Sequence, residues 1–384
     1  MDLQNLKYLV VGAGFFGSVV AERIAADLGE RVLVIDKRDH TGGNSYSEVD
    51  RDTGIECHCY GSHIFHTSNT KVWNYINKFC TFNSYRHKVL SNCRGKIYPM
   101  PINLETINAY YGKYLTPLEA QAFIKTEIDR AGIIKPKNLE EKAISLVGKQ
   151  LYEAFVKEYT IKQWGTDPRN LPDTIITRLP VRINYLTDYF NDPWQGIPLN
   201  GYHNIFEKML YHPLIEVKLN CNFFDIRHYL PTSCCVIYTG PIDRFFDYKY
   251  GELGWRTLVF EKEICLTGDF QGTAVMNYAD AAVPYTRIHE FKHYKIERFY
   301  PDGKSVIYRE YSTGIGASLD PFYPVRASRD EVALSCYQQE ADKKKNVFFG
   351  GRLGSYRYID MDKAIAEALT LFEEKIKAGV MCPS

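Results

Sequence analysis

The sequence lacks the features that mark membrane, nucleic-acid-binding or secreted proteins. No apolar run approaches the roughly 18 residues that a membrane span requires, and the polar residues 1–8 do not read as a secretory signal. Neither sign of charge is in excess, because 47 basic residues face 46 acidic ones. We therefore expect a cytoplasmic protein that binds neither nucleic acid nor membranes and holds any anionic ligand with a few placed Arg or Lys side chains.

Paired cysteine motifs are also absent. The 10 cysteines are scattered without a C-x-x-C spacing, and a cytosolic chain keeps its thiols reduced. The segment Cys57-His58-Cys59, followed by His63 and His66, contains enough ligand types for a zinc site. Strand alternation would nevertheless put His58 on the face opposite the two cysteines, and no second ligand pair follows. We therefore expect no metal site.

A dinucleotide-binding turn is the strongest local signal that is present. Residues 7–11 form a short apolar strand, a helical pattern follows, and residues 31–35 form a second buried strand that ends on Asp36. The turn between strand and helix contains the G-x-G-x-x-G glycines and a phenylalanine: Gly12, Gly14, Phe16 and Gly17. Such glycines permit a tight turn, close approach of a pyrophosphate and close helix–strand packing, and Asp36 is placed to accept ribose hydroxyls. The pattern predicts a Rossmann-type unit.

The residues after the second strand favour FAD over NAD. Gly42 and Gly43, followed by Asn44, let the chain pass close to the cofactor a second time. This pattern resembles that of flavoproteins of the glutathione-reductase and amine-oxidase types. Residues 348–362 are placed to supply the late strand and helix that return to the flavin in those families. Asp36 also argues against a 2′-phosphate, which it would repel.

The rest of the chain predicts two further units. Residues 88–100 alternate as a hairpin with its turn at 92–95, residues 120–128 and 140–159 have helical patterns, and residues 253–311 alternate as in an antiparallel sheet. Further helices are expected at 68–80, at 203–210 and from about 361, whereas the proline-containing residues 171–200 predict loops and short extended pieces. We expect an α/β fold with a Rossmann-type FAD-binding domain, a helical insertion domain and an antiparallel β-sheet domain. The expected boundaries are 1–84, 201–242 and 325–384 for the first, 103–177 for the second, and 85–102, 178–200 and 243–324 for the third.

Motifs along nearly the whole chain resemble those of bacterial UDP-galactopyranose mutases. Besides the flavin signature they are Y-G-S-H-I-F-H-T (60–67), Y-T-I-K-Q-W-G (159–165), R-L-P-V-R (178–182), V-P-Y-T-R-I (283–288) and G-R-L-G-S-Y-R-Y-I-D-M-D (351–362). The resemblance implies an isomerase that interconverts UDP-galactopyranose and UDP-galactofuranose and so supplies galactofuranose for a cell-surface polysaccharide such as O-antigen or capsule. It further implies covalent catalysis in which N5 of reduced FAD attacks the anomeric carbon, with no net consumption of electrons. A UDP-galactose-type substrate, an external flavin reductant and a homodimer are implied with it.

The resemblance also assigns site residues. Arg178 and Arg287 would hold the departing diphosphate, because a planar guanidinium binds phosphate oxygens bidentately, and a lid in the proline-rich region would carry Arg178. The substrate-binding set is His87, Phe155, Tyr159, Thr160, Trp164, Tyr189, Asn277, Tyr323 and Tyr358. Within it, Phe155 and Tyr159 would share one helix face as a platform for uracil. The cofactor-binding set is Gly12, Gly14, Phe16, Gly17, Asp36, Gly43, Asn44, His63, Ile64, Arg352, Asp360 and Met361.

Two positions depart from the family pattern. His87 stands where members commonly carry Asn near the sugar, and Ser62 occupies a variable position before His63. UDP-N-acetylgalactosamine is therefore an alternative substrate. An amine-oxidase-like FAD oxidoreductase is an alternative of another class, because it would share the N-terminal signature, although it would not need two arginines for a diphosphate. A flavin-free nucleotide-binding protein is a third.

Overall fold

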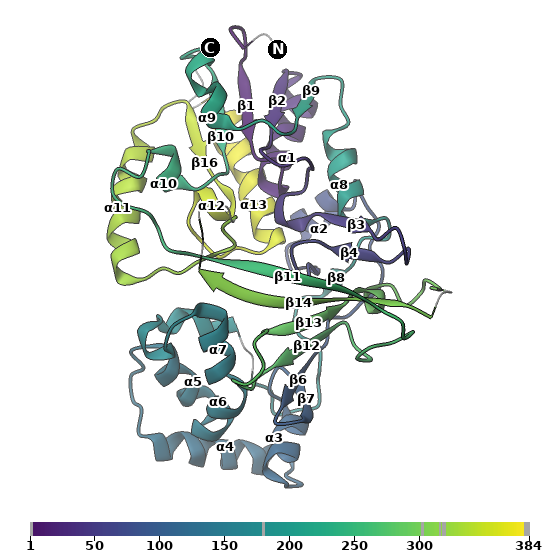
Figure 1. The fold of residues 1–384 in the computed structure, drawn as a ribbon. Coiled ribbons are helices and arrows are strands. Elements are labelled where there is room, and N and C mark those ends of the chain that lie inside the picture. Colours follow the sequence, from purple (N-terminus) through teal and green to yellow (C-terminus); the bar gives the residue numbers. More distant parts are fainter. Residues whose placement is uncertain (1–2, 179–180, 301–302, 315, 317–319, 380–384) are drawn as a thin grey trace.

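A five-stranded parallel sheet forms the centre of the part of the molecule that contains both chain ends (Figure 1). The computed structural model describes residues 3–178, 181–300, 303–314, 316 and 320–379. The strand order is β16-β10-β1-β2-β9, and every neighbouring pair is parallel. The strands are β1 (Tyr8–Val11), β2 (Val32–Ile35), β9 (Ile215–Lys218), β10 (Cys235–Tyr238) and β16 (Val347–Phe349).

The central strands of this sheet are apolar throughout because both of its faces are covered. Along β1 and β10, Val10 and Ile237 pack into the core on one face, while their neighbours Leu9 and Val236 pack into the core on the other. The first face is covered by α1 (Phe15–Arg23), α8 (Gly201–Leu210) and α13 (Met361–Leu371). The second is covered by the short helices α9 (Phe223–Ile226) and α10 (Ile242–Phe245). The Rossmann-type arrangement is confirmed.

A seven-stranded sheet lies between this unit and a group of helices (Figure 1). Its order is β15-β11-β14-β13-β12-β6-β7. The strands are β6 (Val89–Cys93), β7 (Lys96–Met100), β11 (Trp255–Cys265), β12 (Val275–Tyr278), β13 (Arg287–Glu290), β14 (Ser305–Gly314) and β15 (Tyr323–Pro324). The expectation of an antiparallel sheet is correct for all pairs but one: β6 and β12 run parallel, which the long stretch of chain between them permits.

The helices on the far side of this sheet have a core of their own, which Tyr98 and Ile102 from the sheet side complete. They are α3 (Leu104–Tyr111), α4 (Pro117–Ala131), α5 (Leu139–Val147), α6 (Lys149–Phe155) and α7 (Lys157–Trp164). The pattern over 140–159 suggests continuous helix, but the structure breaks it at Gly148 and Val156. Phe155 and Tyr159 therefore belong to different helices, and the prediction that one helix carries both is wrong.

The remaining elements connect these units. Two small sheets pair β3 (Ser47–Val49) with β4 (Glu56–His58) and β5 (Phe65–Thr67) with β8 (Trp194–Gly196). The other α-helices are α2 (Thr70–Ile76), α11 (Ser328–Asp342) and α12 (Gly351–Gly354). Short 3-10 or π turns occur at η1 (Ile24–Leu28), η2 (Gly43–Ser45), η3 (Pro168–Asn170), η4 (Asp173–Arg178), η5 (Arg227–Tyr229), η6 (Phe291–Tyr294) and η7 (Phe372–Ile376). Within the described part of the chain, no helix has the length and apolar character needed to cross a bilayer.

Two local expectations differ from the structure. Residues 171–200 are not only loops and extended pieces, because η4 forms a helical turn within them. The pattern also misses α11, whose apolar side is narrow: Leu334 and Tyr337 are buried, while most of its other side chains are partly or fully exposed.

Candidate active site

A cavity of about 560 Å³ opens where β1, β2 and β10 end, at residues Val11, Ile35 and Tyr238. Ligands of open α/β sheets bind at this edge. Gly12 makes the tight turn there with a φ of +101°. A Cβ on Gly17 would lie 2.0 Å from the Gly12 carbonyl oxygen and 2.8 Å from Val10 Cγ1, so the third glycine of the motif is needed for close helix–strand packing.

The N-terminus of α1 faces this cavity. The N-cap residue is Gly14, which has no side chain that could cap the first N–H groups of the helix. Gly14, Phe16 and Gly17 line the cavity. The first backbone N–H groups of a helix carry a partial positive charge and bind anions such as a pyrophosphate. The turn thus has the shape and the donors that a dinucleotide requires.

Asp36 lies at the same edge and is nearly buried. Its Oδ2 accepts from Ala13 N at 2.8 Å and its Oδ1 from Arg38 N at 3.0 Å, which fixes the carboxylate at the mouth of the turn. An ionised carboxylate has about four acceptor positions. Asp36 therefore retains capacity for ribose hydroxyls.

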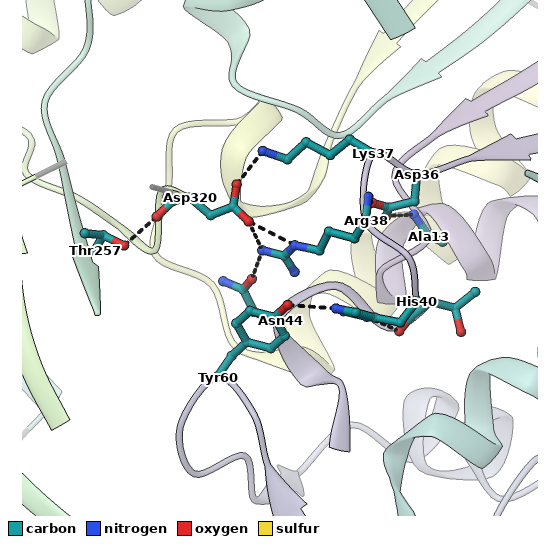
Figure 2. Close-up of polar contacts among 10 residues, drawn as sticks. Ala13, Asp36, Lys37, Arg38, His40, Asn44, Tyr60, Thr257 and Asp320 are labelled. Atoms are coloured by element: carbon teal, nitrogen blue, oxygen red, sulfur yellow. Dashed lines mark hydrogen bonds and ion pairs between the residues drawn. The ribbon is translucent and has the colours of Figure 1, made fainter. Parts of the chain in front are cut away.

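Sequence reasoning missed Arg38 and Asp320, which also line this cavity. Figure 2 shows the polar contacts of both side chains. Arg38 Nε and Nη2 donate to Asp320 Oδ2 at 3.0 and 2.7 Å, and Nη2 also donates to Asn44 Oδ1 at 2.8 Å. Lys37 pairs with the other oxygen of Asp320, and the Thr257 hydroxyl donates to the Asp320 carbonyl at 2.6 Å. These contacts tie the segment before β15 to the end of β2. Nothing in the sequence pattern indicates a pairing between positions so far apart.

A second cavity, of about 630 Å³, lies between the seven-stranded sheet and the helices. Its walls include the predicted catalytic residue Arg287 and most of the predicted substrate-binding residues: His87, Phe155, Tyr159, Tyr189, Asn277, Tyr323 and Tyr358. Phe155 and Tyr159 thus face one cavity although a helix break separates them.

Thr160 and Trp164 line neither cavity: Thr160 is buried, and Trp164 packs against the helical core. Arg178 ends η4, but its side chain lies outside the described part of the structure.

Arg287 is a cation of the second cavity, which Arg352 also lines. Arg287 Nη2 donates to the Tyr159 hydroxyl at 2.6 Å, and its Nε pairs with Glu310 Oε1 at 3.1 Å. Burial disfavours the charged guanidinium, but the Glu310 carboxylate and the neighbouring tyrosines together outweigh burial and raise the pKa of Arg287. Burial would raise the pKa of Glu310, but Arg287 and the hydrogen bond from His289 hold that pKa below its usual range. Arg287 is therefore a permanently charged group in a fixed orientation.

His87 and its surroundings form an aromatic wall. Burial lowers the pKa of His87 to about 3, so the ring is neutral near pH 7. Its Nδ1 lies 3.1 Å from the Tyr85 hydroxyl, and its ring stacks with that of Phe190. A neutral imidazole and the buried, unpartnered Oδ1 of Asn277 are polar contacts suited to an uncharged, hydroxyl-bearing ligand.

The two cavities meet at His63, Arg352, Asp360 and Met361, which line both. Burial lowers the pKa of His63 to about 4. Arg352 Nη2 donates to the Ile359 carbonyl at 2.8 Å, and its guanidinium lies 4.9 Å from the ring centre of Tyr358. Ile64, expected on the cofactor side, lines the second cavity instead. A ligand that fills the first cavity can therefore reach a ligand in the second.

The cysteine and histidine cluster of residues 57–66 does not converge on one point. His58 Nδ1 accepts from His63 N at 3.0 Å, and His66 Nδ1 binds Asp192 Oδ2 at 2.6 Å. Within the described residues, the side chains that come close enough for a shared ion are Asp269, Glu290 and His293, and these line neither cavity.

Comparisons with known proteins identify both halves of this arrangement. The profile of the UDP-galactopyranose mutase family matches residues 154–358, and that of the NAD(P)-binding Rossmann-like domain matches residues 10–79. A probable UDP-galactopyranose mutase of Klebsiella pneumoniae is 45% identical over 376 residues, which cover 97% of this chain and 95% of the relative. A dTDP-fucopyranose mutase of Escherichia coli is 42% identical over 375 residues, 97% and 98% of the two chains.

Solved structures share the fold. The crystal structure of a reduced UDP-galactopyranose mutase has a TM-score of 0.75 at 16% identity, over 98% of this chain and 96% of the other. A putrescine oxidase variant has a TM-score of 0.56 at 11% identity, over 97% and 99% of the two chains, so the amine-oxidase likeness is one of fold alone. A nucleotide-binding Rossmann-type domain beside an arginine-containing cavity, with this similarity along nearly the whole chain, leads to one conclusion. The chain belongs to the UDP-galactopyranose mutase family.

Proposed function

We propose that this protein interconverts UDP-galactopyranose and UDP-galactofuranose with FAD bound in the first cavity and the nucleotide sugar in the second. The observation that carries the proposal is the junction of the two cavities at His63, Arg352, Asp360 and Met361, beside the fixed cation Arg287. When bound and reduced, the flavin would supply a nucleophilic nitrogen to the anomeric carbon of the sugar.

The residues of the first cavity would hold FAD. The turn at Gly12 and Gly14 and the free N–H groups of α1 are suited to the pyrophosphate, and Asp36 to ribose hydroxyls. We exclude a cofactor with a 2′-phosphate on its ribose, because the Asp36 carboxylate would repel that phosphate. The contacts of Arg38 with Asp320 and Asn44 would close the cavity over the cofactor.

The residues of the second cavity would bind the substrate and balance the charge of its leaving group. Nε of Arg287 pairs with Glu310, and Nη2 donates to the Tyr159 hydroxyl, so Nη1 is left for phosphate oxygens. Tyr189, Tyr323 and Tyr358 bring hydroxyls into the same cavity, and Phe155 offers a ring for stacking on uracil. Arg178 remains our prediction for the second phosphate-binding cation. A homodimer, an external flavin reductant and a cytoplasmic location belong to the same proposal.

One alternative substrate has a specific basis, since the fucopyranose mutase relative is nearly as similar as the galactopyranose mutase relative. dTDP-fucose lacks the 6-hydroxyl of galactose and differs in the base and ribose of its nucleotide. A ligand that lacks a hydroxyl leaves the buried polar group of the protein that would bind this hydroxyl without a partner. The free-energy cost of that unpaired group is large enough to discriminate strongly between the two ligands. The neutral His87 and the unpartnered Asn277 Oδ1 are two polar groups of the second cavity that could make that discrimination.

The test is a substrate comparison under reducing conditions. The dithionite-reduced enzyme is incubated separately with UDP-galactose, UDP-N-acetylgalactosamine and dTDP-fucose, and furanose products are separated by chromatography. We expect the highest kcat/KM with UDP-galactose and no product from the oxidised enzyme. A higher value with either other sugar would reassign the substrate, and net oxidation without furanose would refute the mutase assignment.

A further inference from the structure

A buried chain of hydrogen bonds runs behind Arg287 and reaches the loop before His63. Glu310 Oε2 lies 2.9 Å from His289 Nε2, and His289 Nδ1 contacts the Ser62 hydroxyl, which in turn contacts the Tyr294 hydroxyl. His289 is fully buried and lines neither cavity, whereas Glu310 and Ser62 line the second. His289 can therefore affect a ligand only through its neighbours.

Strand geometry explains why these side chains meet. Arg287 and His289 are two residues apart on β13 and so lie on the same face of the sheet. Glu310 on β14 is the cross-strand partner of Arg287, and its carboxylate reaches both side chains. One carboxylate thus holds the Arg287 guanidinium on one oxygen and the His289 ring on the other.

The direction of every hydrogen bond in the chain is determined. Glu310 is ionised and can only accept, so His289 Nε2 must donate. Burial lowers the pKa of His289 despite Glu310, so the ring is neutral and its Nδ1 must accept from the Ser62 hydroxyl. Ser62 Oγ then accepts from the Tyr294 hydroxyl. A buried network whose members all have partners is rigid. Arg287 joins it through the ion pair of its Nε with Glu310 Oε1, which lacks hydrogen-bond geometry.

We propose that His289 is a positioning residue: through Glu310 it fixes the direction in which Arg287 presents its guanidinium to the substrate diphosphate, and through Ser62 it ties that direction to the loop before His63. The proposal rests on the proposed function, which assigns the diphosphate to Arg287. Without the Nε2 donor, Glu310 Oε2 loses its partner and only the contacts of Oε1 with Thr286 and Arg287 remain, so the carboxylate holds the Arg287 guanidinium less firmly.

The test compares binding of UDP and uridine to the FAD-loaded protein by isothermal titration calorimetry. The ratio of the two Kd values reports the diphosphate contacts and needs no turnover. We expect H289L to lower the preference for UDP about tenfold, the equivalent of one charge-assisted hydrogen bond, with uridine binding and FAD content unchanged. H289Q, which retains a donor for Glu310, should recover most of the preference, and H289L should add little to R287A.

The matched control is H293L. His293 lies on the next short element, pairs with Asp269 and Glu290, and lines neither cavity, so the wild-type preference is expected. If H289L does not load FAD, S62A tests the same chain by removing the Ser62 hydroxyl, which donates to His289 Nδ1 and accepts from Tyr294, and a severalfold loss of the UDP preference is expected. An unchanged preference in H289L or S62A, or an equal weakening of UDP and uridine, would overturn the proposal. If R287A itself keeps the UDP preference, the diphosphate assignment fails instead.

Discussion

Replacing Arg287 with alanine removes the cation of the second cavity that pairs with Glu310. With Nε held by Glu310 and Nη2 by Tyr159, the wild-type side chain can offer about two charge-assisted hydrogen bonds to a diphosphate. Each contributes about 1.5–3 kcal/mol, so R287A should lower kcat/KM by roughly 10² to 10⁴-fold. Glu310 keeps its contacts with His289 and Thr286, so the free energy of unfolding should fall by less than the about 3–5 kcal/mol typical of a stranded buried charge.

The assay measures furanose formation by the reduced enzyme, with FAD content read from the absorbance near 450 nm. The first cavity does not include Arg287, so the variant should retain its flavin. R287K is the informative companion, because it keeps the charge but not the planar fork, and an intermediate loss is expected. If R287A stayed within tenfold of the wild type while folded and flavin-loaded, the diphosphate would have to be held elsewhere.

Three further perturbations test the structural basis of the site. G17A places a Cβ 2.0 Å from the Gly12 carbonyl oxygen, and this overpacking should lower the free energy of unfolding by about 1–3 kcal/mol. We expect a lower Tm and a reduced FAD content. Wild-type values of both would show that the turn relaxes freely. His87 has a folded pKa of about 3, below the ordinary value of 6.5, so its contribution is fully present above pH 6.5 and is lost as the pH falls toward 3. The free energy of unfolding, measured by urea denaturation between pH 7.5 and 5, should therefore depend less on pH in H87Q than in the wild type. The same pH dependence in both proteins would contradict the assigned pKa of His87. Four backbone carbonyl oxygens lie 2.7–3.1 Å from Lys162 Nζ and share its three N–H donors. K162M should therefore lower the free energy of unfolding by about 2–4 kcal/mol, while the exposed ion-pair control K125M should lower it by under about 1 kcal/mol. Equal losses would refute the role of Lys162.

The parts of the fold that depend on local pattern are predictable from the sequence. The apolar runs at β1 and β2 and the spacing of Gly12 and Gly17 predict a strand–turn–helix unit, because period and turn chemistry are properties of neighbouring residues. The hairpin at 88–100 is confirmed for the same reason. The break at Val156 was not predicted, because no glycine or proline marks it and the helical pattern continues across it.

Of the site residues, too, those in local sequence motifs were predictable and those brought in by tertiary contacts were not. Arg287 and Tyr159 stand in motifs that resemble those of the family, and the structure brings their side chains together. The partner of Arg287 has no such signal, because Glu310 is one acidic residue in an alternating strand and only the β13–β14 register places it opposite Arg287. The pairing of Arg38 with Asp320 depends likewise on the tertiary arrangement. Contacts between residues far apart in the sequence come from the assembled sheets, and single-sequence patterns do not contain them.

The most direct test of the central claim counts turnovers per reducing equivalent. The FAD-loaded enzyme is reduced anaerobically with a stoichiometric amount of dithionite, the excess is removed, and UDP-galactose is added in large molar excess. An isomerase that consumes no electrons should form many equivalents of UDP-galactofuranose per flavin while the absorbance near 450 nm stays low. Product formation limited to about one equivalent per flavin, with reoxidation of the flavin during turnover, would contradict the account and favour an oxidoreductase.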